Sequence, residues 1–303
     1  MANRKKKQGT TNQVVARSRR LTFLAFSIPG IFLYSMFFIY PVLMGIYYSL
    51  TDWNGISRNV NFIGLANYVK IFTKSPRFRN AITFNLRYTV MYVALILVLG
   101  IFLALILNHK VKGITFFRAA FFLPAVLCGV TVGLIYGQIF YRVVPAVGKA
   151  LGIEALSTNI LASKQNAIYG VLFVHLWQGV ALPTLLFLAG LQTIPTELYE
   201  AAAIDGANGW QQFKHITVAY LIPTLSVVLV LLVKQGLMVF DYVKSMTAGG
   251  PGTATQTIAL LIYNNGFERN RYSYSIAQAI ATGVIIALIS AIQIQASNRK
   301  KVD

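Results

Sequence analysis

The chain has 303 residues, of which 56% are hydrophobic and only 12% are charged, and its mean hydropathy is +0.62. Soluble domains carry about 25% charged residues, so this composition excludes one or two ordinary soluble domains. The charges are also unbalanced, with 27 Lys and Arg against 8 Asp and Glu and a formal net charge of +19. Too little polar surface remains for a nucleic-acid-binding protein, and the composition instead indicates several membrane spans with basic residues in the loops.

Cysteine and histidine usage limits the chemistry further. The single cysteine, Cys128, lies inside an apolar run, which excludes a disulfide framework and a multi-cysteine metal site. None of the three histidines is paired with another at a spacing typical of metal ligands. We therefore expect this chain to bind no metal and no cofactor.

Six apolar segments are long enough to cross the hydrocarbon core, which takes roughly 20 residues. All are expected to be helices, because backbone polar groups in lipid must be satisfied internally. The first is too long for the apolar part of a signal peptide and is expected to be a retained anchor. In chain order the segments are 21–50, 86–108, 114–140, 167–191, 221–240 and 274–294. The predicted fold class is an all-α membrane protein with six transmembrane helices.

The predicted organisation is one membrane domain, 21–296, between a basic N-terminal segment, 1–20, and a tail, 297–303. Basic residues flanking spans favour the cytoplasmic side, and the N-terminal cluster usually dominates. With six spans, both termini are expected to be cytoplasmic. The loop 192–220, between the fourth and fifth spans, then faces the cytoplasm as well.

That cytoplasmic loop has the pattern of a short helix. Thr196 is expected to be its N-cap, and Glu197 lies in the first turn, where the helix dipole favours anions. Three successive alanines are strong helix formers. Gly206 fits the position just past the helix, where glycine adopts a left-handed conformation at little cost. A second helix is expected to begin after Asn208 and to continue into the fifth span.

The same loop carries a specific motif. Its sequence Glu200-Ala201-Ala202, followed by Gly206 and Ile216, resembles the EAA motif of permease subunits of binding-protein-dependent ABC importers. The family pattern continues with a Leu-Pro pair after the isoleucine, and this chain lacks that pair.

Two further stretches, 49–68 and 239–257, resemble the carbohydrate-uptake, maltose-type branch of that family. The resemblance implies the type I ABC importer permease fold in a bacterial-type cytoplasmic (inner) membrane. It also implies a subunit that passes sugars or oligosaccharides from an external binding protein to the cytoplasm.

The resemblance further implies partners. These are a second homologous permease, two copies of an ABC ATPase, an extracellular solute-binding protein and membrane lipid, with no nucleic acid. The chain contains no G-x-x-x-x-G-K-[ST] phosphate loop, so we expect no enzyme activity of its own. ATP and Mg are expected on the partner ATPase. The residues implied to couple the permease to that ATPase are Glu200, Ala201, Ala202, Asp205 and Gly206.

Candidates for the substrate pathway are polar and aromatic residues within the spans, since transporters often bind substrate near the midplane. Trp177 and Gln178 lie in the fourth span, Lys234 and Gln235 in the fifth, and Tyr92 in the second. A lysine inside a span costs about 2.5–3.5 kcal/mol on insertion, which marks it as a functional candidate and favours an acidic sugar.

Several alternatives stay open. The Lys234 side chain can instead extend to the outer surface or pair with a carboxylate of the partner permease. Trp177 and Gln178 can be helix-packing residues, and His175 a packed interior histidine. The alternative cargo is a non-sugar solute such as glycerol phosphate or a polyamine. An ion channel and a membrane enzyme are disfavoured, because the spans show neither a pore motif nor paired acids.

Overall fold

The structure, a computed structural model, describes residues 23–108 and 113–299. Within these ranges it is built from helices and short turns without a β-strand. A long first helix, Phe23–Ser49, contains η1 and α2. The elements are η1 Ser35–Ile39, α2 Tyr40–Ser49, α3 Ala66–Thr73, α4 Pro76–Asn108, α5 Ile114–Val126, α6 Gly129–Gln138, η2 Ile139–Val143, α7 Val144–Ala150, η3 Glu154–Leu156, η4 Ile160–Ala162, α8 Ala167–Gly179, α9 Ala181–Leu191, α10 Thr196–Ile204, α11 Gly209–Gln212, η5 Phe213–Thr217, α12 Val218–Leu237, α13 Asp241–Met246, α14 Ile258–Tyr263, η6 Asn264–Glu268 and α15 Tyr272–Arg299.

Helices long and apolar enough to cross a membrane are the main feature of the fold. Five single helices of the described residues qualify, and a bent pair makes a sixth. The six are Phe23–Ser49, Pro76–Asn108, Gly129–Ala150, Gly209–Met246, Tyr272–Gln295 and the pair Ala167–Gly179 with Ala181–Leu191. The all-α class is confirmed, and the five to six candidate spans agree with the expected six, but the third candidate, Gly129–Ala150, overlaps the predicted segment 114–140 only in part.

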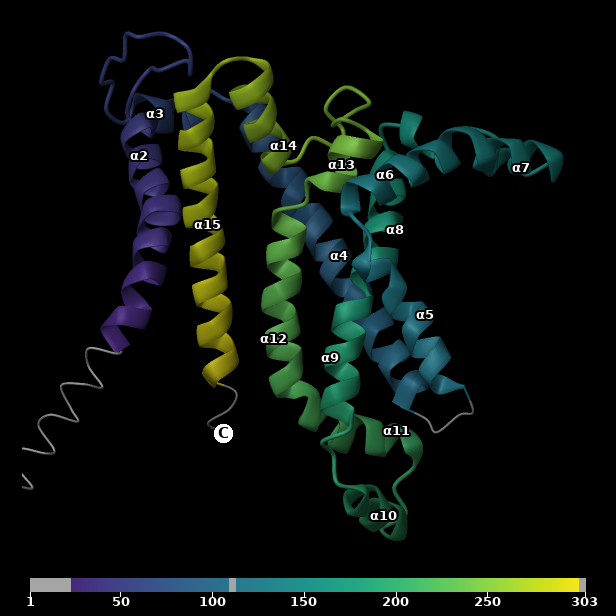
Figure 1. Ribbon diagram of the computed structural model, residues 1–303. Helices are drawn as coiled ribbons and strands as arrows, with labels where there is room; N and C mark the ends of the chain where they lie inside the picture. The colour runs from purple at the N-terminus through teal and green to yellow at the C-terminus, as the bar shows by residue number, and fades with distance from the viewer. Residues whose placement is uncertain (1–22, 109–112, 300–303) are drawn as a thin grey trace, which may run out of the picture.

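The predicted span 114–140 is wrong as a single helix. α5 ends at Val126, and Leu127 and Cys128 are extended. The 13 residues of α5 are about 20 Å long, shorter than the hydrocarbon core. α6 and α7 then extend sideways, across the direction of α12 and α15 (Figure 1). Pro124 lacks an N–H, which weakens the helix in the turn just before the break.

The predicted span 167–191 is broken as well, with a bend of 43° between α8 and α9. Pro183 lies in the first turn of α9 and cannot donate a hydrogen bond to the carbonyl of Gly179. The bend at Val180 redirects the chain, so that α9 packs against α12 and α8 against α13, while both contact α4 and α5.

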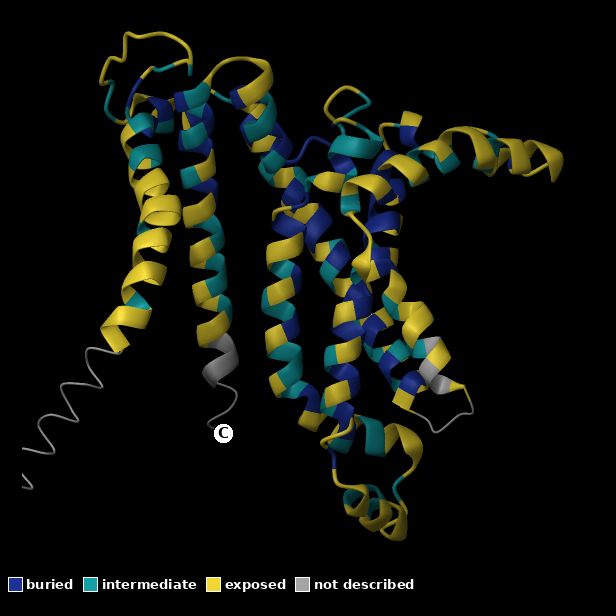
Figure 2. Ribbon diagram, viewed as in Figure 1, coloured by how far each residue is buried: buried dark blue, intermediate teal, exposed yellow. Residues whose placement is uncertain are grey.

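A core cluster holds α4 against α8, α9 and α12. Tyr88, Tyr92 and Ile96 from α4, Phe187 from α9 and Leu232 from α12 are fully buried in it. A second, smaller cluster joins α3, α4, α14 and α15 at one end of the molecule. Burial differs strongly between helices. Figure 2 shows many buried residues in α8 and α9, whereas the first helix is exposed over nearly its whole length.

The two ends of the helix bundle carry different elements. The first helix begins, and α15 ends, at the same end as α10 and α11 (Figure 1). α3, α13 and α14 lie at the opposite end. The predicted placement of both termini and the loop 192–220 on one side of the membrane requires this arrangement.

Candidate functional site

The first candidate site is the hairpin formed by α10 and α11. α10 begins one residue earlier than predicted, since its N-cap is Pro195, with φ −61° and ψ 133°, and Thr196 is the first helical residue. The prediction of Thr196 as the cap is therefore wrong. Proline supplies the extended cap geometry at its fixed φ, and its missing N–H leaves no donor to satisfy. Glu197 lies in the first turn, as expected.

The end of α10 is set by Gly206, as predicted. Its φ is +79°, a conformation that costs glycine little and a side chain with a Cβ more. The Gly206 N–H donates to the Ala203 carbonyl at 3.1 Å, and the Ala207 N–H donates to the Ala202 carbonyl at 2.8 Å. This pair of bonds is the Schellman arrangement, which satisfies the last carbonyls of a helix and reverses the chain direction.

A capping box starts the second helix. The Asn208 side chain accepts from the Gln211 N–H at 3.0 Å, and the Gln211 side chain accepts from the Asn208 N–H at 2.8 Å. The helix continues through η5 into α12, which confirms the predicted second helix running into the fifth span. The hydroxyls of Tyr199 and Thr217 are 2.9 Å apart and tie α10 to the start of α12.

This hairpin is unusually exposed. No residue of α10 is buried, and the apolar side chains of Ile204 and Trp210 are 86% and 70% exposed. Figure 1 shows α10 projecting beyond the helix ends. Beside it, a hollow of about 600 Å³ is lined by both α4 and α11, including Leu105 and Trp210. Apolar side chains exposed together with charged ones suit a protein-binding surface.

The predicted coupling residues are close together on this projection. Glu200, Ala201, Asp205 and Gly206 are exposed, and Ala202 is half-buried. Asp205 is the C-cap of α10, so its backbone belongs to the turn that Gly206 completes.

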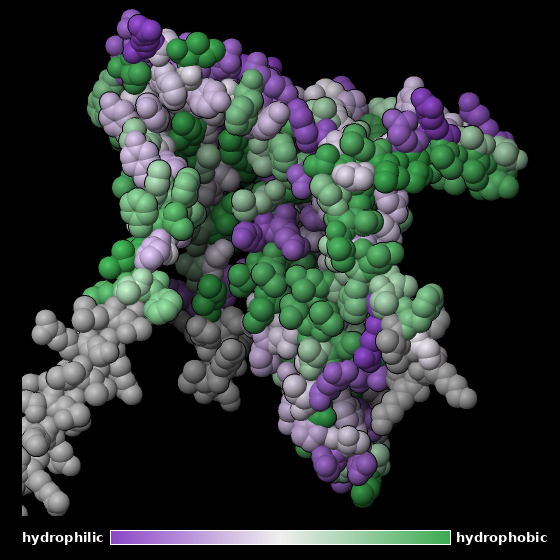
Figure 3. Space-filling model, in the orientation of Figure 1, coloured by the Kyte–Doolittle hydropathy of each residue, from purple (hydrophilic) through white to green (hydrophobic). Residues whose placement is uncertain are grey.

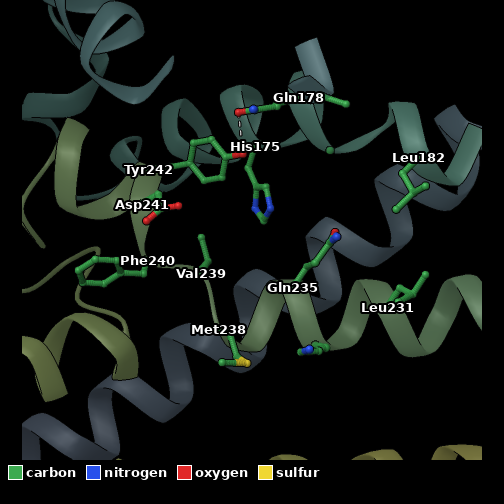
Figure 4. Close-up of a pocket in the computed structure, with 13 residues that line it drawn as sticks. His175, Gln178, Leu182, Leu231, Gln235, Met238, Val239, Phe240, Asp241 and Tyr242 are labelled. Carbon is green, nitrogen blue, oxygen red and sulfur yellow. Dashed lines mark hydrogen bonds between the residues drawn. The ribbon is translucent and has the colours of Figure 1, made fainter. Parts of the chain in front are cut away.

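The second candidate site is an open cavity of about 770 Å³ between α8, α9, α12 and α13. Figure 4 shows His175, Gln178 and Tyr242 on one side of it and Gln235 and Met238 on the other. Three of the predicted pathway residues line this cavity, namely Gln178, Lys234 and Gln235.

Aromatic rings form a buried stack behind this cavity. The ring centroids of Tyr92 and His175 are 4.0 Å apart, and the planes are inclined by 15°. The Tyr88 hydroxyl lies 3.0 Å from His175 Nδ1, and the Tyr92 hydroxyl donates to Gln235 Oε1 at 2.9 Å. Tyr92 thus positions the Gln235 amide, although Tyr92 itself is fully buried.

Gln178 is held from two directions. Its Nε2 donates to the Leu127 carbonyl at 2.6 Å, and its Oε1 accepts from the Tyr242 hydroxyl at 2.8 Å. The first bond satisfies a carbonyl at the break after α5, and the second, drawn as a dashed line in Figure 4, holds α13 against α8. Gln178 therefore joins three elements at the edge of the cavity.

Gly179 permits the close approach of α4 and α8. A Cβ at this position would overlap the Tyr92 hydroxyl. A larger residue at position 179 would displace the hydroxyl that bonds Gln235.

Lys234 is exposed and lies near the end of α12, which stops below the level reached by α15 and α14 (Figure 1). In Figure 3 a hydrophilic patch interrupts the hydrophobic belt over the upper end of α12, where Gln235 is exposed as well. Within the described ranges, the Lys234 amine has no carboxylate within ion-pair distance.

Trp177 does not line this cavity. Its ring packs against Tyr136, with centroids 5.3 Å apart, and 37% of the residue is exposed. The sequence reasoning missed Asp241 and Tyr242, which do line it. They follow the fifth span, and the stretch 239–257 that resembles the maltose-type branch was the available signal. The part of the chain that the structure describes holds no group of three or more side chains suited to a metal.

Comparisons with known proteins match most of the chain. Residues 96–301 match the family described as binding-protein-dependent transport system inner membrane component. The chain is 45% identical over 277 residues to the multiple sugar-binding transport system permease protein MsmF of Streptococcus mutans, covering 91% of this chain and 95% of MsmF. It is 35% identical over 263 residues to AmyD of Thermoanaerobacterium thermosulfurigenes, a probable starch degradation products transport system permease protein, covering 87% and 89%.

A solved structure has a similar fold. It is a bacterial ABC transporter involved in the import of the acidic polysaccharide alginate, with a TM-score of 0.81 at 23% identity, covering 93% of this chain and 96% of that one. The likeness shows that the two chains share the type I ABC importer permease fold.

Proposed function

The chain belongs to the family of inner membrane components of binding-protein-dependent transport systems, and from this we propose that it passes a sugar or oligosaccharide from an external binding protein to the cytoplasm. The observation that carries the proposal is the projecting helix α10, which has no buried residue, at one end of a bundle that also holds an open cavity lined in part by Gln178, Lys234 and Gln235. The sugar-related names of MsmF and AmyD support the choice of cargo. Nothing comparable supports glycerol phosphate or a polyamine.

The proposed energy source is a pair of ABC ATPase subunits that bind ATP and Mg. In this proposal α10 inserts into the ATPase, with Glu200 offering a charge, Ala201 and Ala202 permitting close approach, and the turn at Gly206 aiming the helix. The end of the assembly that carries α10, the start of the first helix and the end of α15 is then cytoplasmic. In this proposal residues 21–296 form one membrane domain.

A second permease completes the pathway in this proposal. The exposed first helix and the exposed residues Lys234 and Gln235 leave apolar and polar surface that a homologous subunit would cover. Solute would then pass between the two permeases, beside the Tyr92–Gln235 bond. An acidic sugar is a second candidate cargo, favoured by the exposed amine of Lys234 within the hydrophobic belt.

The test is a complex of this chain with its second permease, ATPase and binding protein in liposomes. Replacing Glu200 with Lys is expected to reduce ATPase activity stimulated by the loaded binding protein more than tenfold, because the new charge would face the ATPase. Glu154→Lys is the matched control, since Glu154 is also exposed but lies in η3, far from α10. If both variants were as active as the unaltered complex, the assignment of Glu200 to coupling with the ATPase would be wrong.

A further inference from the structure

A basic cleft lies between α3, the start of α4 and the connection from α14 to α15, at the opposite end from α10. It consists of two adjoining hollows of about 390 and 480 Å³ that share Lys70, Arg271 and Tyr274. We call it the cationic cleft. Its cations, all exposed, are Lys70, Lys74, Arg77, Arg269 and Arg271.

These five cations are only partly balanced, because Asp52 is the one carboxylate among the described residues that line the two hollows. The ion pair found among the described residues joins Lys244 to Glu268, neither of which lines the cleft. Asp52 borders one hollow, but its two oxygens already accept from the Asn61 N–H at 2.9 Å and the Asn61 side-chain amide at 3.0 Å. The side-chain bond, and then the backbone bond, lower the pKa of Asp52, so its charge is stabilised by Asn61.

Buried polar groups hold part of the cleft in place. Asn265, which is 3% exposed, donates from Nδ2 to Gln278 Oε1 at 2.7 Å and accepts at Oδ1 from the Arg269 guanidinium at 3.2 Å. The Arg271 N–H donates to the Asn265 carbonyl at 2.8 Å. The Lys70 amine lies 5.4 Å from the centre of the Tyr274 ring. The segment between α14 and α15, which carries Arg269 and Arg271, is therefore held in a fixed backbone geometry.

Two long helices begin at this cleft. α4 starts at Pro76 and α15 at Tyr272, so the positive ends of both helix dipoles add to the field of the side chains. An anion in the cleft would be attracted by both.

The cleft adjoins the ends of two long apolar helices. The Asn67 side chain donates to the carbonyls of Ser49 and Thr51, which places α3 directly on the end of the first apolar helix. The Thr51 and Ser273 hydroxyls are 2.8 Å apart, so α15 begins at the same level. Trp53 and Tyr274 line the cleft, and such residues concentrate at the membrane–water interface.

We propose that the cationic cleft binds the phosphate headgroup of an anionic phospholipid. Guanidinium groups bind phosphate through paired hydrogen bonds, and the two lysines add point charges. A bound headgroup would join α3, α4, α14 and α15 at the membrane surface. This lipid site is independent of substrate transport and of the coupling helix.

The experiment is a titration of the purified full chain, in a neutral detergent, with phosphatidylglycerol or phosphatidylcholine, and bound lipid is counted by native mass spectrometry. The unaltered chain is expected to bind phosphatidylglycerol at least tenfold more tightly than phosphatidylcholine. A triple variant, Lys70→Gln, Arg77→Gln and Arg271→Gln, is expected to weaken phosphatidylglycerol binding about 100-fold, because each cation near an anionic lipid adds attraction.

The matched control removes three exposed cations elsewhere at the same end, through Arg142→Gln, Lys149→Gln and Lys164→Gln. It is expected to bind like the unaltered chain, and equal weakening in both triple variants would overturn the proposal. A charge-preserving triple variant, Lys70→Arg, Arg77→Lys and Arg271→Lys, should retain binding; if it loses binding as fully as the Gln variant, charge is not what the cleft supplies. Addition of inorganic phosphate separates the two sources of phosphate, and its binding without lipid, or its displacement of phosphatidylglycerol at millimolar concentration, would also overturn the lipid assignment.

Discussion

The hairpin formed by α10 and α11 and the cavity are built in opposite ways. Every hydrogen bond that caps α10 and α11 joins residues a few positions apart, such as Ala202 with Ala207 and Asn208 with Gln211. The cavity instead depends on the bond between Tyr92 and Gln235, which are far apart in the chain. A short segment can fix its own shape, whereas the cavity exists only when the whole bundle has packed.

The two regions also differ in exposure. The hairpin presents apolar side chains to its surroundings, while the Tyr92 and His175 rings behind the cavity are buried. Substitutions in the hairpin should therefore change coupling without unfolding the protein. Substitutions behind the cavity should change stability and transport together.

The largest effect is expected from Gly206→Val. A β-branched residue at φ +79° is strained by roughly 1–2 kcal/mol, and the turn would relax and redirect α10. Coupled transport and stimulated ATPase activity of the liposome complex should fall more than tenfold, while the thermal unfolding temperature of the chain stays nearly constant. Gly209→Ala is the control, because Gly209 has open space around it and an ordinary φ. Full activity of Gly206→Val would show that the turn does not aim the helix.

The next largest effect is expected from Gly179→Ala. The new Cβ would displace the Tyr92 hydroxyl from Gln235, and overpacking of a core costs about 1–3 kcal/mol. We expect a lower unfolding temperature and roughly tenfold slower uptake. Gly137→Ala is matched to it, since a Cβ there would meet Met246 at an ordinary 3.8 Å. If the two variants behave alike, the contact with Tyr92 does not shape the cavity.

A selective effect is expected from Lys234→Met, which removes a charge and keeps the length of the side chain. Uptake of an acidic oligosaccharide should fall about tenfold, corresponding to roughly 1.4 kcal/mol, and uptake of a neutral one should not change. Lys164→Met, at an exposed position outside the spans, is the control. Unchanged uptake of every substrate in Lys234→Met would end the acidic-sugar idea.

The smallest effect is expected from Tyr242→Phe. The variant loses one hydrogen bond to Gln178, worth about 1 kcal/mol, so the unfolding temperature should drop by a few degrees. Tyr141→Phe should leave it unchanged, because Tyr141 is 63% exposed. An equal decrease in both variants would mean that the Gln178 bond adds nothing to the stability of α13.

The sequence predicted the class of fold and the family, and both are confirmed. It also predicted the end of α10, because Gly206 is a local signal for a left-handed turn. It did not predict the break after Val126. Proline and glycine, the residue types at positions 124 and 129, also occur inside continuous helices, and the surrounding run is uniformly apolar. The contact that satisfies the Leu127 carbonyl comes from Gln178, a residue distant in the chain.

The cavity was predicted only in part, for the same reason. Polar residues within apolar spans pointed to Gln178, Lys234 and Gln235, but periodicity did not show that Trp177 faces Tyr136 instead. Tyr242 lies outside the predicted spans and comes to the cavity only because α13 folds back over α8. The roles of the coupling residues stay predictions, which the Glu200 and Gly206 variants address.

The length of α4 has a consequence for the membrane itself. Its 33 residues extend about 50 Å, well beyond a hydrocarbon core of roughly 30 Å. One end borders the cationic cleft, its middle supplies Tyr92, and its other end borders the hollow beside Trp210. A change in bilayer thickness that alters the tilt of this one helix would therefore act on all three places at once.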